Sequence, residues 1–123
     1  MDAEPTKKQR IAGWVLSALP SLLLIFSGVM KLTKSPEVVE GFTKFGFAET
    51  VIQPLGVVEL LSTVLFLVPK TSFIGAILLT GYLGGAICTH MRVGEPFFMQ
   101  FAFGVIVWVG FGLRRPRAIR AGF

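Results

Sequence analysis

Four long apolar runs, separated by short polar connections, account for most of the chain. They extend from Ile11 to Lys31, from Val51 to Val68, from Thr71 to Met91 and from Phe97 to Leu113. Each run is about 17 to 21 residues long, which at 1.5 Å per helical residue matches a bilayer hydrocarbon core about 30 Å thick. None of the runs alternates polar and apolar residues as a barrel strand would. The pattern therefore predicts four transmembrane helices, over residues 11–31, 51–68, 71–91 and 97–113.

The connections indicate how these helices are arranged. Pro69 and Lys70 leave room only for a tight turn, so the second and third spans should be antiparallel neighbours. The longer connection, residues 32–50, contains a short amphipathic pattern, with Ser35 placed to cap a helix that has Pro36 at its first position. Gly46 is suited to end that helix. We expect the helix to lie on the outer membrane surface. Its apolar face comprises Val38, Val39, Phe42 and Phe45.

The predicted fold class is therefore all-α. It is a four-transmembrane-helix antiparallel bundle with a short amphipathic interfacial helix in the first loop. The chain should form a single integral membrane domain over residues 1–123. The arginine-rich segment 114–123 should be a mobile basic C-terminal tail.

Composition agrees with a membrane protein. The chain has 123 residues, of which 53% are hydrophobic and 15% charged, and its mean hydropathy is +0.72, whereas soluble domains carry about 25% charged residues. The net charge of +5 comes from basic residues beside the spans, where orientation and anionic headgroups explain them, so no nucleic acid is expected as a partner. The single cysteine, Cys88, excludes an intramolecular disulfide and a cysteine metal cluster.

Basic residues also predict the orientation, because lysine and arginine accumulate on the cytoplasmic side. With both termini cytoplasmic, eight basic residues lie inside and four lie outside. The eight inner residues are Lys7, Lys8, Arg10, Lys70, Arg114, Arg115, Arg117 and Arg120, and the four outer ones are Lys31, Lys34, Lys44 and Arg92. We expect a multi-pass protein of the bacterial inner (plasma) membrane with both termini cytoplasmic.

Small and polar residues form one stripe on each apolar run, and such stripes mark helix interfaces in lipid. The stripe of the third run is Gly81, Gly85 and Thr89, with Gly84 and Cys88 alongside. The stripe of the first run is Ser17, Ser21, Gly28 and Lys31, and that of the second is Gln53, Gly56, Glu59 and Thr63. The fourth run offers Gln100 and Gly104, and later Gly110 and Gly112. We expect these faces to pack against each other, with membrane lipid around the remainder.

Glu59 interrupts the second run near its middle, where an ionisable group costs about 2.5–3.5 kcal/mol on insertion scales. Counting about 1.5 Å per residue from the outer ends of the spans places Tyr82 within reach of Glu59. The same count places Lys31, His90 and Gln100 toward the outer side. We therefore predict an outward-facing polar pocket that binds a ligand. A protonated Glu59 hydrogen-bonded between helices is the structural alternative. Lys31 as an interfacial anchor and His90 as a boundary histidine are the corresponding alternatives for those residues.

No enzyme motif is present: GxSxG, HExxH and phosphate-loop patterns are all missing from the chain. One histidine and one cysteine do not make a metal site by themselves. We therefore assign no catalytic residue, no metal and no intrinsic cofactor. Whether the chain is an enzyme stays open, and a non-catalytic role is favoured.

Short segments spread over nearly the whole chain resemble the DoxX-like family of small four-helix membrane proteins. They are GVMKL, FTKFGF, GVVELLSTVLFLVP and GAILLTGYLGGAICTHMRVGEP. Lys31, Glu59 and His90 match polar positions that recur in that family. The family takes its name from a membrane subunit associated with thiosulfate:quinone oxidoreductase, so the resemblance implies a link to quinone or sulfur redox chemistry.

Two functions follow as expectations. The first is a non-catalytic accessory subunit, or a binder of a small amphiphilic, quinone-like ligand, that works with a membrane redox partner protein. The alternative is a small proton-coupled transporter that acts as a homo-oligomer and uses Glu59 as its proton site. An enzyme with His90 or Glu59 as general base is the weakest of the three hypotheses.

Overall fold

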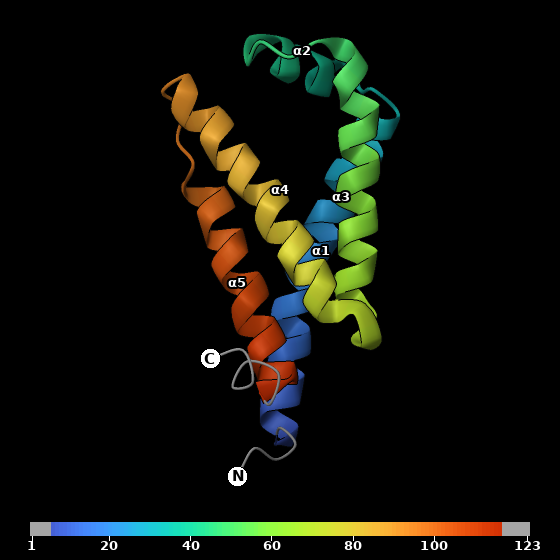
Figure 1. Cartoon of the computed structure of the whole chain (residues 1–123), viewed down its shortest axis with the longest axis vertical. Helices are drawn as coiled ribbons and strands as arrows, with labels where there is room; N and C mark the ends of the chain where they lie inside the picture. Colours follow the sequence, from blue (N-terminus) through green and yellow to red (C-terminus); the bar gives the residue numbers. More distant parts are fainter. Residues whose placement is uncertain (1–5, 117–123) are drawn as a thin grey trace.

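The computed structural model describes residues 6–116, and every regular element in that range is helical (Figure 1). This confirms the all-α prediction. The elements are α1 (Lys7–Leu32), α2 (Pro36–Lys44), η1 (Glu49–Val51), α3 (Ile52–Leu67), η2 (Pro69–Thr71), α4 (Ser72–Arg92) and α5 (Phe98–Arg114).

The four long helices alternate in direction along the chain. α1 packs against both α3 and α5, and α4 packs against the same two helices on the other side. α1 begins and α5 ends at one end of the molecule, which we call the terminal end, while α2 crosses the opposite end, which we call the α2 end (Figure 1). The arrangement is therefore an antiparallel set of four helices.

Three stretches are long and apolar enough to cross a membrane: Lys7–Leu32, Glu49–Leu67 and Pro69–Arg92. They indicate a multi-pass membrane protein. The fourth apolar helix, α5, has 17 residues, and its crossing of the membrane stays a prediction.

Glycines bring the helix backbones together at three interfaces. A methyl group on Gly28 of α1 would lie 2.7 Å from Leu60 Cγ of α3, and one on Gly110 of α5 would lie 2.9 Å from Ser17 Oγ of α1. A methyl group on Gly75 of α4 would overlap the backbone of Phe66 in α3. Close backbone approach of this kind stabilises helix pairs in lipid.

The predicted small-residue faces of α1 and α3 are largely confirmed. Ser17, Ser21, Gly28 and Lys31 are buried on α1, and Gly56, Glu59 and Thr63 are buried on α3. The prediction for α4 is wrong. Gly81, Gly84 and Gly85 have no atom within 4 Å of an added methyl group, and α4 instead packs through Ser72, Gly75, Ala76, Leu79 and Leu83.

Arg114 holds the terminal end together. Its guanidinium donates to the Phe66 carbonyl at 3.3 Å and to the Ser72 hydroxyl, and it lies 4.3 Å from the centre of the Trp14 ring. The side chain therefore joins α1, α3, α4 and α5. The prediction of a tail over 114–123 is wrong at its start, because Arg114 belongs to α5 and is buried. Residues 117–123 lie outside the described part of the chain.

The helix predicted in the first loop is α2. Ser35 accepts from the Val38 amide as its N-cap, Pro36 opens it, and Gly46 follows it with φ +85°. Arg92, at the end of α4, donates to the Phe45 carbonyl at 2.6 Å. The apolar residues Val38, Phe42 and Phe45 line the space between the long helices, so this face covers the bundle.

Replacing Arg114 should destabilise the terminal end. We expect Arg114→Ala to lower the free energy of unfolding by about 3 kcal/mol, because a desolvated cation–π contact and charge-assisted hydrogen bonds are lost together. Arg115→Ala is the matched control, since Arg115 is exposed and donates only to the Pro69 carbonyl; its effect should stay below about 1 kcal/mol. Equilibrium unfolding in mixed micelles measures both. Equal effects would contradict the role given to Arg114.

Candidate ligand-binding cavity

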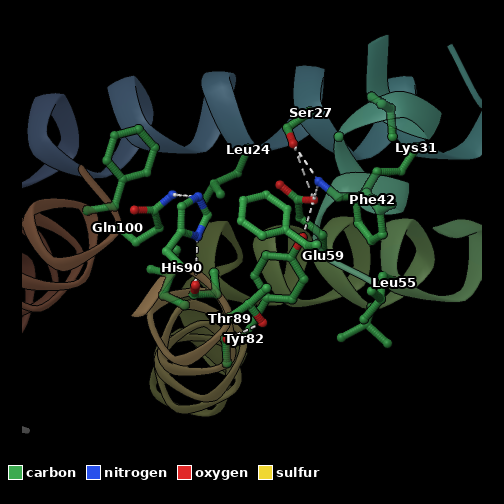
Figure 2. Close-up of a pocket in the computed structure, with 18 of the residues that line it drawn as sticks. Leu24, Ser27, Lys31, Phe42, Leu55, Glu59, Tyr82, Thr89, His90 and Gln100 are labelled. Atoms are coloured by element: carbon green, nitrogen blue, oxygen red, sulfur yellow. Dashed lines mark hydrogen bonds and ion pairs between the residues drawn. The ribbon is translucent and has the colours of Figure 1, made fainter. Parts of the chain in front are cut away.

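A cavity of about 730 Å³ lies in the α2 half of the bundle. All five α-helices contribute to its wall. Its lining residues include Leu23, Leu24, Ser27, Lys31, Val38, Phe42, Phe45, Leu55, Val58, Glu59, Gly81, Tyr82, Gly85, Ala86, Thr89, His90, Gln100 and Phe103. The five predicted site residues, Lys31, Glu59, Tyr82, His90 and Gln100, are all among them (Figure 2).

Glu59 is the centre of a polar cluster on one side of this cavity. Its Oε1 accepts from Lys31 Nζ at 2.8 Å and from the Tyr82 hydroxyl at 2.8 Å. Lys31 Nζ also donates to Ser27 Oγ at 2.7 Å. Glu59 is 1% exposed and Lys31 is 9% exposed. The cluster is therefore an ion pair enclosed by protein, and its side chains come from the three helices α1, α3 and α4.

The local sequence explains why Lys31 reaches Glu59. Lys31 lies in the last turn of α1, one turn beyond Ser27, and both face α3. A methyl group on Gly56 would lie 2.9 Å from Lys31 Cβ, so only glycine lets the α1 and α3 backbones come this close. The interpretation of Lys31 as an interfacial anchor is not supported, because the Lys31 ammonium is directed at the Glu59 carboxylate rather than at solvent.

His90 and Gln100 form a second polar pair that lines the same cavity. His90 Nδ1 lies 2.8 Å from the Ala86 carbonyl, and His90 Nε2 lies 3.4 Å from Gln100 Nε2. The Ala86 carbonyl only accepts, so His90 Nδ1 carries a proton and donates to it. His90 Nε2 faces the side-chain amide of Gln100. The His90 ring also packs on Phe45, at 4.7 Å between centroids.

Apolar groups separate the two polar clusters. Figure 2 shows Leu24 and aromatic rings between the His90–Gln100 pair and the Glu59 cluster. Gly81 and Gly85 contribute bare backbone to the wall, where a side chain would meet no atom within 4 Å. The glycines that were expected to pack helices instead leave the cavity open.

Two contributors to this site were missed by sequence reasoning. Ser27 could have been found, because it precedes Lys31 by one helical turn. Phe42 was placed on a face of α2 directed at the membrane surface, yet its ring lies 6.0 Å from Lys31 Nζ. Gln53, expected on the polar stripe, donates to the Leu32 carbonyl at 2.9 Å and satisfies the end of α1 instead.

No group of three or more histidine, cysteine or acidic side chains lies close enough to hold a metal ion within residues 6–116. The site chemistry of the described chain is therefore that of one ion pair, a phenol, an imidazole and an amide, set in apolar walls.

Breaking the Lys31–Glu59 pair should cost more than removing it entirely. Lys31→Met leaves a buried carboxylate unpaired and should lower the free energy of unfolding by about 3–5 kcal/mol. The double change Lys31→Met with Glu59→Leu should recover most of that loss. Lys34→Met, which breaks the exposed Lys34–Glu49 pair, is the control and should cost about 1 kcal/mol or less. Additive single and double effects in mixed-micelle unfolding would contradict the coupling.

Comparison with known proteins identifies a family. A family description, that of the DoxX-like family, matches residues 15–111. Searches of curated proteins and of solved structures found no match. The matched range contains the cavity and all five predicted site residues. The chain therefore belongs to the DoxX-like family.

Proposed function

We propose that this DoxX-like membrane protein is a non-catalytic binder of a small, neutral, quinone-like amphiphile in a membrane redox process, acting beside a redox partner protein. The observation that carries the proposal is the cavity of about 730 Å³ with two polar clusters set in apolar walls. Its size falls within the range of small-molecule sites, about 300–1,000 Å³.

The positions of the polar groups in the cavity support a ligand whose ring carries an oxygen at each of two opposite ends. The Glu59 cluster and the His90–Gln100 pair lie on different sides of the cavity, with Leu24 and aromatic rings between them (Figure 2). Gly81 and Gly85 leave free space at the cavity wall. A planar ring would pack there while its oxygens face the two clusters.

The lining also supports a ligand that arrives through lipid. Leu23 and Val58 line the cavity and are 57% and 46% exposed, so the cavity is not sealed by the long helices. At the α2 end, in contrast, α2 covers it and is fixed to α4 by the bond from Arg92 to the Phe45 carbonyl. These features support entry of a molecule that dissolves in the bilayer.

A non-catalytic role is supported by the contacts of the titratable groups. Glu59 Oε1 is bonded to Lys31 and Tyr82, and both ring nitrogens of His90 face groups within the protein. Glu59 Oε2 has no donor among the described residues, so it is the acceptor that remains for a ligand. The transporter alternative has weaker support, because Glu59 would have to leave Lys31 and Tyr82 to carry a proton; it requires flux that is lost in Glu59→Gln.

Filling the cavity should abolish binding. With protein in nanodiscs and tritiated 2-decyl-1,4-benzoquinone as probe, we expect saturable binding that Gly85→Leu weakens about tenfold or more, since the leucine occupies the ligand's space. Gly84→Leu is the matched control, because Gly84 is equally open but does not line the cavity, and it should bind as the wild type does. Absent binding, or equal loss in both variants, would refute the proposal.

We further propose that α5 is a fourth span and that both termini are cytoplasmic in the inner membrane. The support is the alternation of helix direction (Figure 1) and the position of basic residues at the start of α1, in the turn between α3 and α4, and after α5. These residues are Lys7, Lys8, Arg10, Lys70 and Arg115.

Cysteine labelling tests this orientation. In a Cys88→Ser background, Glu40→Cys on α2 should react with an impermeant maleimide in intact cells, and Lys8→Cys should react only after permeabilisation. Both positions are exposed, so reactivity reports the side of the membrane. The reverse pattern would overturn the orientation, and labelling of Arg115→Cys from outside would show that α5 does not cross in the expected sense.

A further inference from the structure

The two oxygens of the Glu59 carboxylate have different surroundings. Oε1 accepts from Lys31, from Tyr82 and, at 3.5 Å, from Ser27. No residue in the described range donates to Oε2. Figure 2 shows this second oxygen directed away from Lys31, toward the His90 side of the cavity.

Oε2 belongs to a residue of the cavity wall. Glu59 lines the cavity although its side chain is only 1% exposed. A carboxylate oxygen without a donor is costly away from bulk water. The wall therefore holds a buried acceptor, Glu59 Oε2, that lacks a hydrogen-bond donor among the described residues.

The charges around the cavity favour a neutral occupant. Its titratable lining residues in the described chain are Lys31, Glu59, Tyr82 and His90. Lys31 and Glu59 neutralise each other at 2.8 Å. A charged ligand would thus remain unpaired among apolar walls, which is unfavourable.

Resting on the proposed function, we infer that the cavity selects its ligand by a hydroxyl group that donates to Glu59 Oε2. The hydroxyl-bearing form of a quinone-like ring, the hydroquinone, then binds more tightly than the carbonyl-bearing quinone. A carbonyl oxygen only accepts, so beside Oε2 it brings two acceptors together with no proton between them.

Competition binding tests the inference directly. Protein in nanodiscs, kept under argon, is loaded with tritiated 2-decyl-1,4-benzoquinone and titrated with unlabelled 2-decylhydroquinone or unlabelled quinone. The hydroquinone should compete about tenfold more strongly, which is the effect of one hydrogen bond to a charged acceptor. Glu59→Gln places an amide donor where Oε2 was, and should abolish or reverse that preference. The double variant Lys31→Met with Glu59→Gln repeats the test without an unpaired lysine.

Glu49→Gln is the matched acid-to-amide control, since Glu49 is exposed, pairs with Lys34 and does not line the cavity. It should keep the wild-type preference. Equal competition by both forms, tighter binding of the quinone, or a preference unchanged in Glu59→Gln would overturn the inference and leave the proposed function standing. No saturable binding of either form would refute the proposed function, and the inference with it.

Discussion

The α2 half of this protein depends on the ion pair between Lys31 and Glu59. Two charges removed from water remain stable only if they meet closely and their other polar atoms are bonded. The 2.8 Å contact, the bond from Tyr82 and the bond to Ser27 meet that condition except at Glu59 Oε2, which has no donor among the described residues. The close approach of α1 to α3 at Gly56 makes the contact possible. The pair thus ties α1, α3 and α4 together around the space that it helps to line.

The two halves of the bundle are packed differently: one has a closed core and the other has a cavity. In the terminal half, Leu24, Phe66, Ala76, Leu79, Val107 and Phe111 form a closed core, and Arg114 joins the four long helices below it. In the α2 half, small residues on α4 leave space and α2 covers it. The packed terminal half supports the half that contains the cavity. The cavity can therefore keep its shape without being filled by side chains, which suits it to holding a ligand.

The helices and the cluster around Glu59 could be predicted because they follow from local rules. The length of the apolar runs predicts the long helices. The cost of burying Glu59 predicts polar partners at a similar depth on neighbouring helices, and Lys31 and Tyr82 are such partners. The role of Gly81 and Gly85 was predicted wrongly, since spacing shows which face is small but not whether a neighbour reaches it. Arg114 was assigned to a tail because hydropathy marks charges as helix ends, whereas its burial depends on Trp14 and Phe66, distant in sequence.

The most direct measurement is the distance between Lys31 Nζ and the Glu59 carboxyl group in a lipid bilayer. Solid-state NMR dephasing between ¹⁵Nζ-lysine and ¹³C-carboxyl-glutamate reports such pairs. Lys31→Met identifies the signal against the Lys34–Glu49 and Lys44–Glu95 pairs. The account predicts strong dephasing, in keeping with the 2.8 Å nitrogen–oxygen contact, that disappears in the variant. Dephasing that is the same with and without Lys31 would show that the two groups are apart in the membrane and would contradict the account.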